Sequence, residues 1–387
     1  MIYYGKQSIS EEDVKVVEAV LRSDFLTQGP AIERFERKVA DYCGTKYAVA
    51  VCNATAALHI ACLSAGLGEE DCLWTSPITF VASANCGRYC SADVDFVDID
   101  EKTYNMSVTA LEEKLRRARK ANKLPKVVIP VHLAGQSCDM VRIKELSEEY
   151  GFTIVEDASH AVGADYLDTK VGSCIFSDMT VFSFHPVKII TTGEGGMVLT
   201  NNRELYEKLM LYRSHGITRD PARMTHVSDG AWYYQQIELG CNYRMTDIQA
   251  ALGASQMTRL DAFVARRREL AACYDELLRG LPLLTPHVME GANPSWHIYV
   301  VRAVFSQIGK TKQQIFEEMR EHGIVLNLHY IPVHRQPYYE KLGFRQGDFP
   351  QSEKYYEEAF TLPLYYDLTN DEQDQIVEAL KTIFRKS

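Results

Sequence analysis

Residues 179–200 read MTVFSFHPVKIITTGEGGMVLT, and they place one lysine, Lys188, between two apolar runs. The runs MTVFSF (179–184) and GMVLT (196–200) are short and mostly apolar, which is typical of buried β-strands. For a lysine taken at random, a role in solubility is the simplest explanation. Whether Lys188 has another role depends on the segments around it.

The same pattern of short apolar runs extends over most of the first 245 residues. Further predicted strands are KYAVAVC (46–52), VDFVDI (94–99), KVVIPVH (126–132) and FTIVE (152–156). Helical stretches such as ATAALHIACLSAG (54–66), CDMVRIKELSEEYG (138–151) and NRELYEKLMLYR (202–213) separate several of them. Apolar strands that alternate with helices predict an α/β fold, in which helices cover both faces of a mostly parallel sheet. Ligands of such sheets bind outside the carboxyl ends of the strands.

A different arrangement begins near residue 245. A long helical stretch at 246–281 leads into WHIYVVRAVF (296–305), a helix near 311–322, the run GIVLNLH (323–329) and a final helix near 370–385. The stretch 281–294, which contains Pro and Gly, is expected to be a loop within this part. We therefore predict a large domain at 1–245, with the N-terminal segment, and a smaller α+β domain at 246–387 that is entered by the long helix.

The composition excludes several classes of partner. The 387 residues are 46% hydrophobic and 24% charged, and their formal net charge of -10 argues against a nucleic-acid or anionic membrane surface. The first residues carry no basic region followed by an apolar stretch, and no apolar run approaches the ~20 residues that span a bilayer, so we expect a cytoplasmic protein. Ten scattered cysteines without a CxxC pair or a Cys/His cluster predict neither a disulfide framework nor a metal site.

Two charged residues follow neighbouring predicted strands. Asp157 comes directly after FTIVE, where a carboxylate is costly unless it has a partner, and taken alone it would be a helix cap. Lys188 follows MTVFSF, and a lysine in a partly desolvated cleft has a lowered pKa and can attack a carbonyl group. An acid and an amine at neighbouring strand ends indicate pyridoxal phosphate. The lysine would form the Schiff base, and the aspartate would keep the pyridine nitrogen protonated.

Such a site also needs donors for the phosphate and a cover for the ring. Ala54 and Thr55 open a helix after KYAVAVC, where backbone N–H groups and the helix dipole favour a phosphate, although a plain strand-to-helix turn explains them equally well. Ser183 is a further candidate donor. Phe80 is placed to stack on the ring, although by itself it would be assigned to the core.

Seven motifs, in order along the chain, closely resemble the DegT/DnrJ/EryC1/StrS family of pyridoxal-phosphate sugar aminotransferases. They are LTQGP (26–30), SPITFVASAN (76–85), VEDASHAVGA (155–164), SFHPVK (183–188), TTGEGG (191–196), RSHG (213–216) and GCNYRMTDIQAALG (240–253). The resemblance implies the aspartate-aminotransferase-like architecture known as fold type I, and a homodimer with active sites at the interface.

The resemblance also assigns roles to single residues. It makes Lys188 the Schiff-base lysine and Asp157 the partner of the pyridine nitrogen. The other cofactor contacts that it implies are Ala54, Thr55, Phe80, His160, Ser183 and, from the other subunit, Asn242. His160 stands where many members have glutamine, which bears on how the ring is covered or which keto position is aminated. Ala54 stands where many have glycine or serine, a change of little consequence because backbone amides bind the phosphate.

Within the family, three stretches resemble the members that act in pseudaminic acid biosynthesis. These stretches are IYYGKQSIS (2–10), VHLAGQS (131–137) and NLHYIPVHRQPYY (327–339). The likeness implies transfer of an amino group from L-glutamate to C4 of a UDP-4-keto-6-deoxy-N-acetylhexosamine, which gives UDP-4-amino-4,6-dideoxy-N-acetyl-β-L-altrosamine. The residues that it places around the sugar nucleotide are Tyr4, Asp24, Phe25, Leu26, Thr27, Asn327, Leu328, His329 and Tyr330.

The implied mechanism uses one site for both substrates in turn, so we expect ping-pong kinetics with Lys188 as the general base. Amination of another nucleotide-linked 4-keto or 3-keto sugar, as in the bacillosamine, perosamine or dTDP-amino sugar pathways, stays open. A pyridoxal-phosphate sugar dehydratase of this fold would be expected to have histidine in place of Lys188. A non-catalytic protein that binds this cofactor would not need Lys188, Asp157 and the phosphate donors together.

Overall fold

The computed structural model describes residues 1–385 and is built around a seven-stranded sheet in the order β1-β9-β8-β5-β4-β2-β3. The strands are β1 (Tyr47–Val51), β2 (Cys72–Thr75), β3 (Asp93–Phe96), β4 (Val127–Ile129), β5 (Thr153–Asp157), β8 (Met179–Ser183) and β9 (Gly196–Thr200). From β3 to β8 all neighbours run parallel, whereas β9 is antiparallel to both β8 and β1. The predicted α/β fold with a mostly parallel sheet is confirmed.

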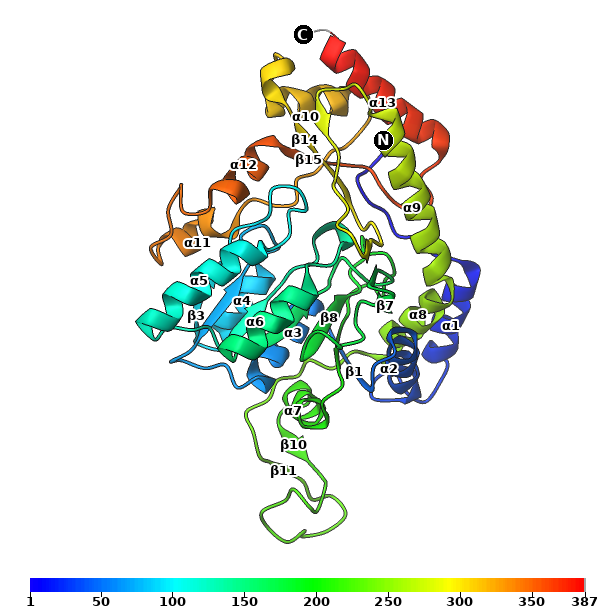
Figure 1. The fold of residues 1–387 in the computed structure, drawn as a ribbon. Coiled ribbons are helices and arrows are strands. Elements are labelled where there is room, and N and C mark those ends of the chain that lie inside the picture. The colour runs from blue at the N-terminus through cyan, green and yellow to red at the C-terminus, as the bar shows by residue number, and fades with distance from the viewer. Residues whose placement is uncertain (386–387) are drawn as a thin grey trace.

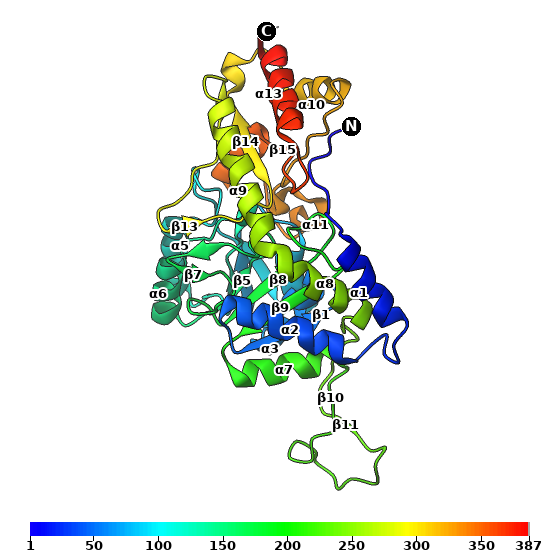
Figure 2. The same ribbon diagram turned by 90° about the vertical axis from the view of Figure 1, so that its right-hand side faces the viewer.

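Helices cover both faces of this sheet (Figures 1 and 2). Successive strand residues point to opposite faces, so Val127 packs in the core on one side and Val128 in the core on the other. The helices on the Val127 side are α3 (Ala54–Ser64), α4 (Ala82–Tyr89) and α7 (Arg203–Arg213). The opposite face is covered by α2 (Pro30–Cys43), α5 (Val108–Ala121), α6 (Met140–Tyr150) and α8 (Asp247–Gln256). No helix within residues 1–385 has the length and apolar content that crossing a membrane requires.

Two N-terminal helices are fixed by polar caps. α1 (Glu11–Leu21) begins after Ser10, and Ser10 forms a capping box with Asp13. α2 begins after Gly29, which has no side chain for capping. The buried carboxylate of Asp247 replaces that cap, because it accepts the backbone N–H groups of Gly29 at 2.7 Å and Ala31 at 2.9 Å.

The residues after α8 form a smaller α+β unit. α9 (Leu260–Leu277) follows α8 after one 3₁₀ turn, Met257–Arg259, so the helical stretch predicted at 246–281 consists of two helices. The sheet of this unit contains β12 (Leu283–Leu284), β14 (Tyr299–Ala303) and β15 (Ala359–Leu362), all antiparallel. Its core includes residues of α9, α10 (Lys312–Glu321) and α13 (Asn370–Arg385), which confirms the two helices expected near 311–322 and 370–385. The short helices α11 (Pro337–Glu340) and α12 (Pro350–Glu358) lie between them in the chain.

Some local predictions differ from the structure. GIVLNLH forms only isolated bridges, among them Ile2 with Ile324, and no strand. The stretch 281–294 contains β12 and also β13 (Ala292–Asn293), which pairs with β6 (Asp165–Tyr166); β6 in turn pairs with β7 (Thr169–Lys170). Ile2 lies in the core of the smaller unit, so the first residues of the chain contact its last part. The domain boundary between residues 245 and 246 stays a prediction.

A hairpin formed by β10 (Ile217–Thr218) and β11 (Gln235–Gln236) projects away from the rest of the chain (Figures 1 and 2). Its tip and base carry exposed apolar side chains, among them Val227, Trp232 and Leu239.

Candidate active site

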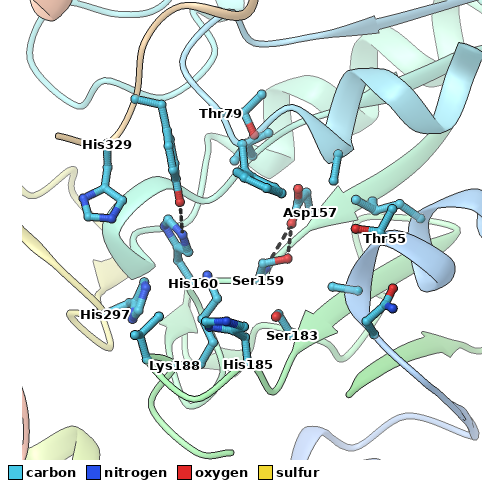
Figure 3. Close-up of a pocket in the computed structure, with 18 of the residues that line it drawn as sticks. Thr55, Thr79, Asp157, Ser159, His160, Ser183, His185, Lys188, His297 and His329 are labelled. Atoms are coloured by element: carbon cyan, nitrogen blue, oxygen red, sulfur yellow. Dashed lines mark hydrogen bonds between the residues drawn. The ribbon is translucent and has the colours of Figure 1, made fainter. Parts of the chain in front are cut away.

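The carboxyl ends of β5 and β8 and the N-terminus of α3 open into a pocket of about 510 Å³ (Figure 3). Its volume lies within the range of small-molecule sites. Both parts of the chain line it, because the segment 327–330 reaches over the ends of the large sheet. The residues singled out from the sequence that line it are Tyr4, Ala54, Thr55, Phe80, Asp157, His160, Ser183, Lys188, Asn327, Leu328, His329 and Tyr330.

One side of the pocket presents hydrogen-bond donors. Asn53 caps α3 by accepting the N–H of Ala56 at 2.9 Å, which leaves the N–H groups of Ala54 and Thr55 in the first turn without an intrahelical partner. Gly196 allows β9 to lie against this turn, because a Cβ atom there would come within 2.5 Å of the Asn53 backbone. The same edge contains Ser183 at the end of β8. A helix N-terminus with added hydroxyl groups is suited to bind a phosphate.

Asp157, at the end of β5, is buried and held on both carboxylate oxygens. Its Oδ1 accepts hydrogen bonds from the backbone N–H of Ser159 at 3.1 Å and from its hydroxyl at 2.5 Å, and its Oδ2 accepts one from the hydroxyl of Ser83 at 2.6 Å. Ser83 in turn lies 2.7 Å from the hydroxyl of Thr79. These bonds fix the direction of the carboxylate into the pocket.

Lys188 lies across the pocket from the α3 terminus, in the turn that follows β8 (Figure 3). Burial lowers the pKa of its ammonium group to about 8, and the negative charge of Asp157 opposes this shift. Phe80 is 58% exposed although it lies in the pocket wall, so its side chain is accessible to a planar ligand. Lys188 is therefore a partly neutral amine near a fixed carboxylate.

Three buried histidines and a tyrosine complete the wall near Lys188, beside the exposed His185. Burial holds the pKa of His160 and of His297 well below the usual histidine range and lowers that of His329 to about 3, and the charge of Lys188 adds to each shift. All three rings are therefore neutral near pH 7. Tyr330 contacts the Nε2 atom of His160 at 3.0 Å, and burial raises its pKa, so it stays protonated.

Five predicted site residues lie elsewhere in this chain. Asn242 is exposed and pairs with Ser214 in an isolated bridge at the base of the projecting hairpin. The other four, Asp24, Phe25, Leu26 and Thr27, are exposed between α1 and α2. The resemblance places Asn242 in the site of a second subunit. The roles of all five residues stay predictions.

Several residues in or behind the pocket wall were not expected from the sequence. Ser83 and Ser159 contact Asp157, and Ser159 could have been found because a serine two residues after an aspartate often bonds back to it. Ser83 is far from Asp157 in sequence, and His297 lies in an apolar strand-like run, so nothing in the local pattern identifies them. Their roles follow only from the fold.

This set of side chains fits pyridoxal phosphate. The α3 terminus with Thr55 and Ser183 matches its phosphate, Asp157 its ring nitrogen, Lys188 its aldehyde, and the exposed side chain of Phe80 its ring.

Comparison with known proteins agrees with this geometry. Residues 7–381 match the DegT/DnrJ/EryC1/StrS aminotransferase family. The chain is 33% identical to the UDP-4-amino-4,6-dideoxy-N-acetyl-β-L-altrosamine transaminase of Campylobacter jejuni, over 100% of this chain and 98% of that protein.

Two solved structures have the same fold. One is Helicobacter pylori PseC, an aminotransferase of pseudaminic acid biosynthesis, with a TM-score of 0.90 and 30% identity over the full length of both chains. The other is a Streptococcus pneumoniae protein described as a sugar aminotransferase, in its PLP form, with a TM-score of 0.88 and 29% identity over 99% of this chain and 98% of that one. The chain belongs to the DegT/DnrJ/EryC1/StrS aminotransferase family and is a pyridoxal-phosphate-dependent sugar aminotransferase of fold type I.

Proposed function

We propose that the protein transfers an amino group from L-glutamate to C4 of a UDP-4-keto-6-deoxy-N-acetylhexosamine, to give UDP-4-amino-4,6-dideoxy-N-acetyl-β-L-altrosamine. The observation that carries this proposal is the pocket in which Lys188, with its pKa lowered to about 8, faces a carboxylate and a helix N-terminus. The likeness to the C. jejuni and H. pylori proteins supports the choice of sugar.

In this proposal the chain holds pyridoxal phosphate at both ends. The N–H groups of Ala54 and Thr55 and the hydroxyls of Thr55 and Ser183 bind the phosphate, with Asn242 of a second subunit as a further contact. Asp157 pairs with the ring nitrogen, and Phe80 covers one face of the ring. When bound, the cofactor supplies an electron sink for the carbon that loses its proton.

Lys188 moves the protons. Because the pKa of Lys188 is close to neutral pH, its amine can accept a proton from Cα of the amino donor. It later returns a proton to C4 of the sugar, from a single face of the ring. That face sets the configuration of the new amine. Asp157 stays fixed during both steps, because Ser83 and Ser159 hold its two oxygens.

The sugar nucleotide is assigned to the side of the pocket formed by Tyr4 and the segment 327–330. Tyr4 lies against His329, with ring centroids 5.2 Å apart, and both line the pocket. In the dimer, the exposed segment 24–27 of the second subunit would complete this side. No arginine of this chain lines the pocket within residues 1–385, so donors from a second subunit would have to meet the charge of the diphosphate.

We propose a homodimer as the active form. On α1 and the segment after it, Val14, Leu21, Phe25 and Leu26 leave about half of their surface exposed, and the projecting hairpin adds Trp232 and Leu239. Exposed apolar side chains in such number favour burial against a second copy of the chain.

The test is an assay of the purified protein with L-glutamate and a panel of UDP- and dTDP-linked 4-keto-6-deoxy sugars, in which NMR identifies the product and its configuration. Preference for the UDP-N-acetylhexosamine substrate and formation of the altrosamine product would support the proposal. Preference for a dTDP sugar, or an amine of another configuration, would reject this substrate and leave the family assignment in place. A ternary complex of both substrates as a required intermediate would reject ping-pong exchange at Lys188.

A further inference from the structure

His160 and Tyr330 form a pair whose hydrogen-bond direction is fixed by the backbone. The N–H of Ala134 donates to Nδ1 of His160 at 3.3 Å, and Nε2 of His160 lies 3.0 Å from the hydroxyl oxygen of Tyr330. Figure 3 shows the second bond as a dashed line from His160. A backbone amide can only donate, so Nδ1 must carry its lone pair and act as the acceptor.

The ring of His160 is neutral, which determines where its single proton lies. Burial holds its pKa well below the usual range, and a second proton is further opposed by the charge of Lys188 and by His329. The ring of His297 faces it with centroids 4.4 Å apart and is neutral for the same reasons. With Nδ1 accepting, the proton of His160 is on Nε2 and is donated to Tyr330.

Tyr330 therefore accepts from His160 and keeps its own proton available. No acceptor for that proton is found among residues 1–385, although the hydroxyl lies at the wall of the pocket. Burial and the charge of Asp157 raise the pKa of Tyr330, so the hydroxyl does not ionise near neutral pH. A donor left without a partner in a partly buried site favours a ligand that accepts its hydrogen bond.

The surroundings keep the pair in place. Ala134 belongs to the 3₁₀ turn Leu133–Gly135, and its carbonyl accepts the N–H of His297 at 3.0 Å. A Cβ at Gly135 would lie 2.9 Å from the carbonyl oxygen of His160, so the close approach of this turn requires glycine. On its other side Tyr330 lies against Phe80, with ring centroids 6.2 Å apart. The direction of the Ala134 N–H is therefore set by the fold.

We propose that Tyr330 donates a hydrogen bond to an oxygen atom of the bound ligand, and that His160 is the positioning residue that directs this bond. The proposal rests on the proposed function, because that function supplies the ligands. The proposed function places the phosphate at the α3 terminus, and Thr55 of that terminus lies across the pocket from His160 and His329 (Figure 3), so the acceptor is another oxygen. The remaining acceptors are the ring oxygen of the cofactor, a carboxylate oxygen of the amino donor and an oxygen of the sugar.

Three variants separate these sources. Tyr330→Phe removes the donor and keeps the ring. His160→Leu removes the group that directs it. His160→Gln is the matched control, because its amide oxygen can accept from Ala134 while its NH₂ group donates to Tyr330. Thermal unfolding checks that each variant is folded.

The first readout is a pH titration of the visible absorption of the protein loaded with pyridoxal phosphate, without substrate. If the acceptor is the cofactor oxygen, Tyr330→Phe and His160→Leu raise the apparent pKa of the transition by about one unit, as expected for one lost hydrogen bond, and His160→Gln restores it. The apparent pKa rises because the cofactor oxygen, without the hydrogen bond from Tyr330, is more negative and holds the nearby imine proton more strongly.

The second readout separates the two half-reactions. If the acceptor belongs to the sugar, the titration is unchanged, but Tyr330→Phe lowers kcat/KM for the sugar about tenfold and changes the glutamate half-reaction by less than twofold. If the acceptor is a carboxylate oxygen of the amino donor, the two half-reactions show the opposite pattern. The proposal is wrong if Tyr330→Phe changes neither readout.

A third readout does not depend on activity. Nitrogen NMR of the ¹⁵N-histidine-labelled protein, assigned with His160→Gln, should show a neutral ring protonated on Nε2. A ring protonated on Nδ1 would overturn the proposal even if the enzyme transaminates. The converse result, the expected tautomer in a protein that aminates no sugar, would reject the proposed function alone.

Discussion

The reactivity of Lys188 can be measured without the cofactor. Its pKa of about 8 makes roughly one molecule in eleven neutral at pH 7, whereas an ordinary lysine with a pKa of about 10.4 is neutral in roughly one molecule in 2,500. Only the neutral amine attacks an electrophile. At pH 7 the amine of Lys188 should therefore be available about 200 times more often than that of an ordinary lysine.

Competitive acetylation of the cofactor-free protein, followed by mass spectrometry of its peptides, tests this value. Labelling of Lys188 should increase about tenfold per pH unit between pH 6 and 7 and level off above pH 8. The exposed residues Lys102 and Lys120 provide references within the same digest. A rate for Lys188 that keeps rising beyond pH 9 would refute the argument that burial holds its pKa down.

Asp157→Asn tests the direction in which the charge of Asp157 shifts the pKa of Lys188. Burial lowers the pKa of Lys188 and the charge of Asp157 raises it, so removing this charge should move the labelling curve of Lys188 further down, by roughly one unit. The variant should bind the cofactor but lose most of its transamination rate, because the partner of the ring nitrogen is gone while the other contacts remain. An upward shift of the curve would mean that Asp157 does not face Lys188 electrostatically.

Three further predictions concern single side chains. Lys188→Ala should fold but give no aminated sugar by NMR, and turnover by this variant would reject the lysine as the catalytic base. Ser83→Ala leaves Oδ2 of Asp157 without a donor and should lower the single-turnover rate about tenfold at equal cofactor occupancy, while an unchanged rate would show that Ser159 alone fixes the carboxylate. Asp247→Ala removes the acceptor of two N–H groups at the start of α2 and should lower the free energy of unfolding in urea by about 2 kcal/mol; a loss below 0.5 kcal/mol would mean that water replaces the cap.

The fold was largely predictable because the sheet is buried on both faces. A strand with helices on each side must be apolar throughout, so five of the strands next to the site, β1, β4, β5, β8 and β9, coincide with apolar runs. β2 is missing from the prediction because its run, CLWT, is short and lies beside charged residues. The antiparallel direction of β9 also could not be predicted, because buried parallel and antiparallel strands have the same composition.

The candidate site could be predicted where a residue lies at the end of a strand or shortly after it. Asp157 and Lys188 stand out because charged side chains end apolar runs, and parallel strands bring such ends to one edge. Ser83 lies on α4 and His297 on the smaller unit, so their distance from Asp157 and Lys188 is set by tertiary packing that no local pattern encodes. The direction of the His160–Tyr330 bond is also set at a distance, by a backbone N–H in another loop.

The three buried histidines near Lys188 are neutral, and this limits how far the pKa of Lys188 falls. It also leaves the carboxylate of Asp157 free for the ring nitrogen of the cofactor. If His160, His297 and His329 were charged, they would repel the ammonium group of Lys188 and lower its pKa much further. The charged rings would also compete with the ring nitrogen of the cofactor for the carboxylate of Asp157. Since the pKa of His329 is about 3 and those of the other two lie well below the usual range, these rings do not titrate between pH 6 and 9. Of Lys188 and these three histidines, only Lys188 changes charge between pH 6 and 9. The labelling curve should therefore show one ionisation from this group of residues, near pH 8. A second inflection near pH 6 that disappears in His160→Gln would show that His160 is protonated there, and would remove the basis for a fixed proton on its Nε2 atom.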